Sequence, residues 1–148
     1  EKESFDEFNL FRETDKIQNS IHEFSFLVVD DDKIGRETLK YMLSDYSSLQ
    51  MAESGKEALA ILEKGSFDAV FLDIMMPEMD GFETLSRIRA IDSDVPVIAV
   101  TARAMPQEKR RIIDSGFNGY ISKPVDRRVL FDVIRESFSK KLNQEKGQ

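Results

Sequence analysis

Side chains that could transfer a phosphoryl group stand directly after four apolar segments of this sequence. They are Asp30, Asp31 and Asp32 after residues 26–29, Asp73 after 69–72, Thr101 after 95–100, and Lys123 shortly after 120–121. Phosphoryl transfer needs mainly a well-placed nucleophile and neutralisation of the phosphoryl oxygens, and these groups could supply both. Each has an ordinary alternative as well: a turn or helix cap for the acids, a strand residue for the threonine and a solvated side chain for the lysine.

Neighbouring carboxylates repel one another, so a cluster of them favours a bound cation. An all-oxygen ligand set is the kind that Mg²⁺ prefers. Asp73 emerges alone from an apolar run, which makes it the predicted nucleophile. The cation, the Lys123 ammonium group and the Thr101 hydroxyl would each hold one phosphoryl oxygen. No separate base is needed, because a carboxylate attacks without losing a proton.

The elements that must position these residues follow from the hydrophobic pattern. Short apolar runs alternate with segments of helical periodicity, which predicts five strands and five helices in an α/β fold. The expected strands are 26–29, 49–53, 69–72, 95–100 and 120–121. A capping box at 54–57 opens one helix, and Pro106 opens another. Sites in open α/β sheets lie beyond the carboxyl ends of the strands, so the candidate residues should converge on one edge.

Composition narrows the class of protein. The chain has 148 residues, 41% of them hydrophobic, which suits one domain with a sizeable core. A net charge of −7 argues against nucleic-acid binding. The absence of cysteine excludes disulfides and thiolate chemistry. No apolar run is longer than five residues, far fewer than a membrane span requires, so we expect no membrane contact and a cytoplasmic location.

Several motifs together resemble the receiver domains of response regulators. They are Val28-Val29-Asp30-Asp31, Leu72-Asp73-Ile74-Met75-Met76-Pro77 with Asp80-Gly81, Val100-Thr101-Ala102 and Ser122-Lys123-Pro124. The resemblance covers about residues 24–140. It implies a flavodoxin-like three-layer α/β/α sandwich whose five parallel strands have the order 2-1-3-4-5.

The resemblance also implies a role for each site residue. Asp73 would accept a phosphoryl group from a histidine kinase or a histidine phosphotransfer protein. Asp31 and Asp73 would bind Mg²⁺ directly, Asp30 would act mainly through water, and the Met75 carbonyl would be a further ligand. The activity would be limited to self-catalysed phosphorylation and slow autodephosphorylation.

Phosphoryl oxygens would be held by Thr101 and Lys123, and the Lys123-Pro124 peptide is expected to be cis. Movement of Thr101 toward the phosphoryl group would let Tyr120 turn inward, a coupling that the resemblance implies. The helix at 106–116 has few apolar residues, so it is a candidate to move. We expect this helix, the fifth strand and the last helix to form the surface for a downstream protein target.

Two residues depart from the common receiver pattern. Met75 replaces a polar residue, and Arg103 places a long cation near the mouth of the site. We expect both to slow attack of water on the acyl phosphate, Met75 by apolar cover and Arg103 by occupying the approach. The alternative is that both side chains only face solvent.

Outside the receiver segment, 25–140, lie an N-terminal extension or linker (1–24) and a polar tail (141–148). The extension is acidic but carries phenylalanines and a helical stripe, so it either docks on something, such as a sister chain, or is a remnant of an upstream domain. A stand-alone regulator and the receiver of a hybrid sensor kinase are both compatible with the sequence, and homodimerisation stays open.

Two other functions are compatible with parts of the sequence. A phosphatase of the haloacid-dehalogenase type would use Asp30 as nucleophile within Asp30-Asp31-Asp32, which leaves Asp73 unexplained. A receiver-like interaction module that works without phosphorylation is the second alternative.

Overall fold

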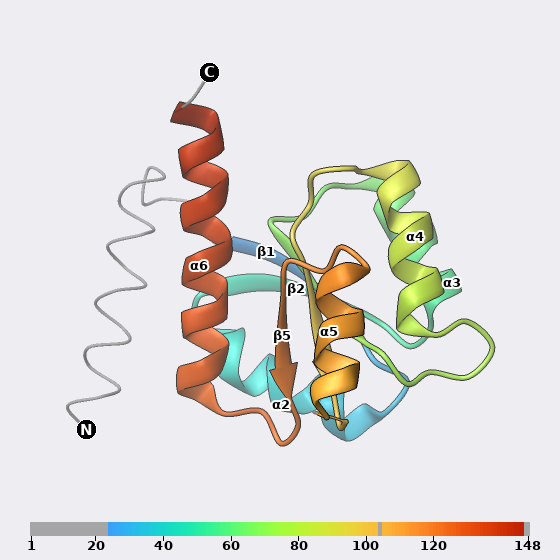
Figure 1. The fold of residues 1–148 in the computed structure, drawn as a ribbon. Helices are drawn as coiled ribbons and strands as arrows, with labels where there is room; N and C mark the ends of the chain where they lie inside the picture. Colours follow the sequence, from blue (N-terminus) through green and yellow to red (C-terminus); the bar gives the residue numbers. More distant parts are fainter. Residues whose placement is uncertain (1–23, 104, 147–148) are drawn as a thin grey trace.

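One parallel sheet with the strand order β2-β1-β3-β4-β5 forms the centre of the computed structural model, which describes residues 24–103 and 105–146 (Figure 1). The strands are β1 (Phe24–Val29), β2 (Ser47–Ala52), β3 (Ala69–Asp73), β4 (Val97–Thr101) and β5 (Gly119–Ser122). The helices are α2 (Lys33–Leu43), α3 (Gly55–Lys64), α4 (Gly81–Ile91), α5 (Pro106–Asp114) and α6 (Arg127–Lys146). The predicted fold class and strand order are confirmed.

Successive side chains of a strand point to opposite faces of the sheet. In the central strands both sets of side chains are buried, each in its own core. Leu27 and Val29 of β1 pack in a core with residues of α3, α4 and α5. Phe26 and Val28 pack in the other core, which residues of α2 and α6 complete. The near-continuous apolar runs in the sequence are therefore the mark of a sheet covered by helices on both sides.

The starts of α2 and α3 are set by side chains that accept hydrogen bonds from free backbone N–H groups. Asp32 accepts from the Ile34 N–H at 3.2 Å and so caps α2. Ser54 accepts from the Glu57 N–H at 3.1 Å and caps α3. The reciprocal bond of the predicted capping box shifts by one residue, because Glu57 accepts from the N–H of Glu53. Asp32, the third acid after β1, thus has a structural role.

Most element boundaries differ from the sequence-based expectation by one to three residues, and three differences matter for the domain limits and the second strand. Phe24, assigned to the extension, is the first residue of β1 and is buried. The second strand begins at Ser47 instead of residue 49. The last helix extends to Lys146, so most of the expected polar tail is helical; residues 139–146 include neither glycine nor proline, which leaves nothing to end the helix.

The other expectations for the extension, residues 1–23, lie outside the described residues. The domain limits of 25 and 140 stay predictions. Within residues 24–103 and 105–146, no helix combines the length and apolar character that crossing a bilayer requires.

Candidate functional site

The sheet brings the predicted site residues to one edge. Parallel pairing places Asp73 opposite Val100 and Thr101 opposite Ser122, so the carboxyl ends of β3, β4 and β5 lie side by side. Asp30 and Asp31 directly follow β1, which pairs with β3. Residues far apart in the chain therefore meet where the strands end, as predicted.

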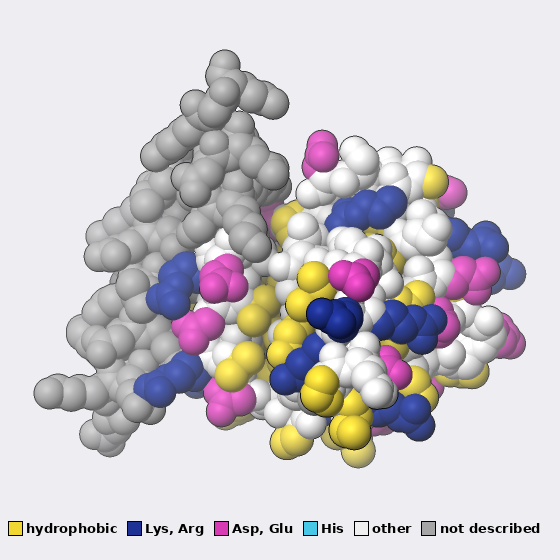
Figure 2. All heavy atoms as spheres, viewed as in Figure 1, with side chains coloured by type: hydrophobic (Ala, Val, Ile, Leu, Met, Phe, Trp, Pro, Cys, Tyr) yellow, Lys and Arg dark blue, Asp and Glu magenta, His cyan; other side chains and the backbone are white. Residues whose placement is uncertain are grey.

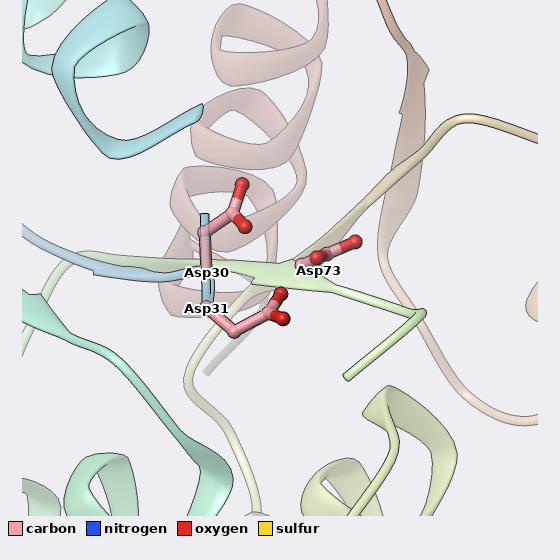
Figure 3. Close-up of side chains that lie close together, drawn as sticks. All are labelled: Asp30, Asp31 and Asp73. Atoms are coloured by element: carbon pink, nitrogen blue, oxygen red, sulfur yellow. The ribbon is translucent and has the colours of Figure 1, made fainter. Parts of the chain in front are cut away.

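Asp30, Asp31 and Asp73 form a compact carboxylate cluster at this edge (Figure 3). One oxygen from each lies within 4.8 Å of the others. Asp30 and Asp73 are 2% and 5% exposed, whereas Asp31 is exposed. Three oxygens at this spacing, one of them open to solvent, match what a hard divalent cation needs.

Lys123 neutralises part of this cluster. Its Nζ lies 3.0 Å from Oδ2 of Asp30 and 3.7 Å from Oδ1 of Asp73. Burial lowers the pKa of Lys123, but the hydrogen bond to Asp30 and the charges of the nearby acids outweigh it and the pKa is raised. The ammonium group therefore stays charged. The Lys123-Pro124 peptide is cis, as the resemblance implied.

Asp73 is a strongly perturbed carboxyl group. Burial is the main cause, and the negative charge of Asp30 adds to it; together they raise the pKa of Asp73 to about 7, although Lys123 and the backbone N–H of Met75 act in the opposite direction. Without a cation, Asp73 is therefore partly protonated near neutral pH. A cation at the cluster would favour the ionised, nucleophilic form.

The Thr101 hydroxyl is engaged with its own loop. It accepts a hydrogen bond from the Arg103 N–H at 3.0 Å and donates to the Arg103 carbonyl at 3.2 Å. Thr101 is 2% exposed, whereas the Arg103 side chain is exposed. The hydroxyl would have to leave these partners in order to bind a phosphoryl oxygen.

Met75 and Tyr120 differ in burial: the Met75 side chain is exposed, and the Tyr120 side chain is half-buried. Met75 donates its N–H to Oδ1 of Asp73 at 3.3 Å, while its side chain is 52% exposed beside the site. Tyr120 is half-buried against the core and pairs with Ala99 of β4. The Nζ of Lys109 lies 5.3 Å from the centre of the Tyr120 ring, a cation–π contact.

Beside Tyr120 the surface is hollowed into a groove of about 640 Å³ between α5, β5 and α6. Its lining residues are Ile113, Phe117, Asn118, Gly119, Tyr120, Ser122, Pro124, Asp126, Val129, Val133 and Glu136. Ile113 and Val129 are 61% and 43% exposed. The groove thus offers apolar side chains to solvent on the surface that was predicted to contact a partner.

Sequence reasoning missed two residues that shape the site. A Cβ at Gly35 would clash with Oδ2 of Asp30, so the first turn of α2 can pass the carboxylate only because residue 35 is glycine. A glycine inside a helix is a recognisable signal of such close approach. Arg36 donates to the Asp30 carbonyl at 2.8 Å, a contact that no local pattern indicates.

Comparisons with known proteins agree with this geometry. The model of the family "response regulator receiver domain" matches residues 26–135. The chain is 38% identical over 140 residues to the sensor histidine kinase RcsC of Escherichia coli, covering 94% of this chain but 14% of RcsC. It is also 38% identical to an uncharacterized 14.6 kDa protein of Leptolyngbya boryana, covering 79% of this chain and 92% of that protein.

Among solved structures, the chain is similar to the receiver domain of the sensor histidine kinase PA1611 of Pseudomonas aeruginosa. The TM-score is 0.72 at 26% identity, covering 78% of this chain and 98% of that one. That structure has a magnesium ion coordinated in its active site cleft. The matched family model spans most of the chain, from β1 into α6. The chain therefore belongs to the response regulator receiver domain family of two-component signalling.

Proposed function

We propose that this chain is a phosphoacceptor that receives a phosphoryl group on Asp73 from a phosphohistidine. The observation that carries the proposal is the position of Lys123, whose ammonium group lies between the buried carboxylates of Asp30 and Asp73. A lysine held there, beside a carboxyl group that emerges alone from an apolar strand, is suited to hold an oxygen of a phosphoryl group on Asp73.

Mg²⁺ is the proposed cofactor, and the donor set fits it because three carboxylate oxygens lie within 4.8 Å of one another. Asp31 and Asp73 would hold the ion directly, Asp30 through water, and the Met75 carbonyl would add a further ligand. When bound, the ion would neutralise charge on the cluster and on the phosphoryl oxygens.

The protein's own groups account for the transfer. An oxygen of Asp73 forms the new bond to phosphorus as the bond from phosphorus to the histidine nitrogen breaks, and the electron pair leaves with the imidazole. Lys123 and Thr101 hold phosphoryl oxygens, which stabilises charge without proton transfer. The reaction needs no base, since the nucleophile is already a carboxylate.

The donor would be a histidine kinase or a histidine phosphotransfer protein, and the reaction would take place in the cytoplasm. The chain spans only 14% of the length of RcsC, so a receiver within a longer hybrid kinase is one setting for it. Activity would be limited to self-phosphorylation and slow autodephosphorylation.

Phosphorylation would be read out at the surface formed by α5, β5 and α6. The Thr101 hydroxyl would exchange its Arg103 partners for a phosphoryl oxygen, and Tyr120 would turn toward the space left behind. Figure 2 shows hydrophobic side chains interspersed with Lys and Arg on this face. Exposed Ile113 and Val129 there favour a protein partner, either a downstream target or a second copy of the chain.

Met75 and Arg103 are proposed to set the lifetime of the acyl phosphate. The Met75 side chain is exposed two residues from Asp73, where its apolar surface would hinder the approach of water. The exposed Arg103 would crowd the same approach from the loop after β4.

The dehalogenase-type alternative is not favoured by any contact among the described residues. Both oxygens of Asp30 are engaged, Oδ1 with the Asp32 N–H at 2.9 Å and Oδ2 with Lys123. Asp30 is therefore suited to organise the site, whereas the nucleophile of such a phosphatase would need a free oxygen.

The test is phosphorylation with acetyl phosphate and Mg²⁺, read by intact-protein mass, together with ¹⁹F NMR of a beryllofluoride adduct. We expect one phosphoryl group on the wild type and none on Asp73→Asn. Asp30→Asn is the matched comparison and should retain some labelling. Labelling that persists in Asp73→Asn but is lost in Asp30→Asn would contradict the proposal, as would absence of both adducts from the wild type.

A further inference from the structure

Arg36 joins three segments around the carboxylate cluster without belonging to it. It lies in the first turns of α2, and one guanidinium nitrogen donates to the backbone carbonyl of Asp30 at 2.8 Å. A second guanidinium nitrogen donates to Oε1 of Glu53, just after β2, at 3.1 Å. The Arg36 side chain is 13% exposed and its bond to the Asp30 carbonyl is partly buried, whereas Glu53 is 68% exposed, so the Glu53 end of the bridge lies in water.

The bridge completes a set of hydrogen bonds that fixes the turn after β1. The Asp30 N–H donates to the Ala52 carbonyl at 3.1 Å, and the Asp32 N–H donates to Oδ1 of Asp30 at 2.9 Å. The Asp30 carbonyl belongs to the planar peptide that leads into Asp31. Arg36 therefore sets the orientation of the peptide from which the Asp31 side chain projects.

Asp31 depends on this backbone more than its neighbours do. Asp30 is additionally held by Lys123, and Asp73 by the N–H of Met75. Asp31 is the exposed member of the cluster. The point from which its carboxylate projects is consequently set by the turn.

We infer that Arg36 is a positioning residue for the cation site, which orients the peptide between Asp30 and Asp31 so that the Asp31 carboxylate meets Asp73. The inference rests on the proposed function. Arginine suits the task because its planar guanidinium group reaches two acceptors in a fixed geometry, which a lysine cannot reproduce.

Loss of a positioning role and loss of the positive charge of Arg36 would change the Mg²⁺ dissociation constant in opposite directions. Arg36 is a cation near a cation site, so its charge alone opposes Mg²⁺ binding, and removing it would strengthen binding. Loss of positioning has the opposite effect: outer-shell partners of metal ligands typically account for about 10- to 100-fold in affinity. A purely structural role would lower thermal stability and leave the Mg²⁺ dissociation constant unchanged.

The experiment measures Mg²⁺ binding by isothermal titration calorimetry for the wild type, Arg36→Ala and Arg36→Lys, with unfolding followed by circular dichroism in EDTA. We expect the dissociation constant to rise about tenfold in Arg36→Ala and to rise in Arg36→Lys as well, although the charge is kept. The matched control is Arg87→Ala, which removes an exposed ion pair with Glu83 on α4 and should leave binding unchanged.

Glu53→Ala tests the positioning role of Arg36 if both Arg36 variants fail to fold. It removes one guanidinium partner and keeps the bond to Asp30, so we expect a rise below threefold. Because loss of a negative charge by itself weakens cation binding, the comparison is Glu57→Ala, which removes a neighbouring exposed carboxylate and keeps the Arg36 bridge. A rise no larger than that of Glu57→Ala would overturn the inference. Unchanged or tighter binding in a folded Arg36→Ala overturns it directly. Failure of the wild type to bind Mg²⁺ or beryllofluoride would instead refute the proposed function and the inference with it.

Discussion

Replacing Asp73 with asparagine should stabilise the Mg²⁺-free protein, and the gain should depend on pH. The substitution keeps the shape of the side chain and removes a charge that burial and Asp30 disfavour. The pKa of Asp73 is raised from 3.8 to about 7, so the folded protein holds this proton more tightly than the unfolded chain does. The raised pKa therefore lowers wild-type stability as pH rises from about 4 to about 7, and the loss is constant above that.

The size of this loss of stability follows from the difference between the two pKa values of Asp73. Each pH unit corresponds to about 1.4 kcal/mol, so an interval of about three units sets an upper limit of about 4 kcal/mol. Asp31 is exposed and the Lys123 side chain is 25% exposed, so solvent screens part of these charges and we expect about 2 kcal/mol. This is a large fraction of the roughly 5–15 kcal/mol by which domains are stable.

Urea unfolding of the wild type and Asp73→Asn, in EDTA at several pH values between 4 and 8, measures the difference directly. Asp73→Asn should be more stable at pH 8, and its advantage should shrink toward pH 4. Asp45→Asn, an exposed position outside the site, is the control and should show no such trend. A difference between wild type and Asp73→Asn that stays constant across this range would refute the reasoning.

Three other predictions concern neighbouring residues. Gly35→Ala should destabilise the protein by about 1–3 kcal/mol in urea unfolding, because the new methyl group displaces the Asp30 carboxylate; Gly65→Ala, where a Cβ meets nothing within 4 Å, is the control, and equal effects would contradict the explanation. Met75→Asn should shorten the phosphoryl lifetime several-fold in a ³²P decay assay; an unchanged lifetime would argue against apolar cover. Lys109→Ala removes the contact over the Tyr120 ring, worth about 0.5–1 kcal/mol, and should increase Tyr120 ring mobility in NMR relaxation, whereas unchanged mobility would show that the contact does not restrain the ring.

Much of the fold could be predicted from the sequence because its signals are local. Alternating apolar runs and helical periods reflect burial on both faces of a sheet, and they located five strands and five helices. The helix starts marked by the Ser54 cap and by Pro106 in the first turn could be predicted, because these signals depend on residues a few positions apart. The boundaries of the helices and strands were harder to predict. For example, α6 continues past residue 140 because polar residues can extend a helix that packing has begun.

The same distinction between local sequence signals and long-range contacts holds for the candidate site. Sequence alone was sufficient to place Asp30, Asp31, Asp73, Thr101 and Lys123 at one edge, because the carboxyl ends of parallel strands must meet there. Only the tertiary structure decided that Lys123 pairs with Asp30, a residue 93 positions away, and that the Thr101 hydroxyl is engaged by the Arg103 backbone. It also decided the roles of Gly35 and Arg36. Charge pairing, desolvation and close approach depend on distances between segments remote in the chain, and no local pattern encodes those distances.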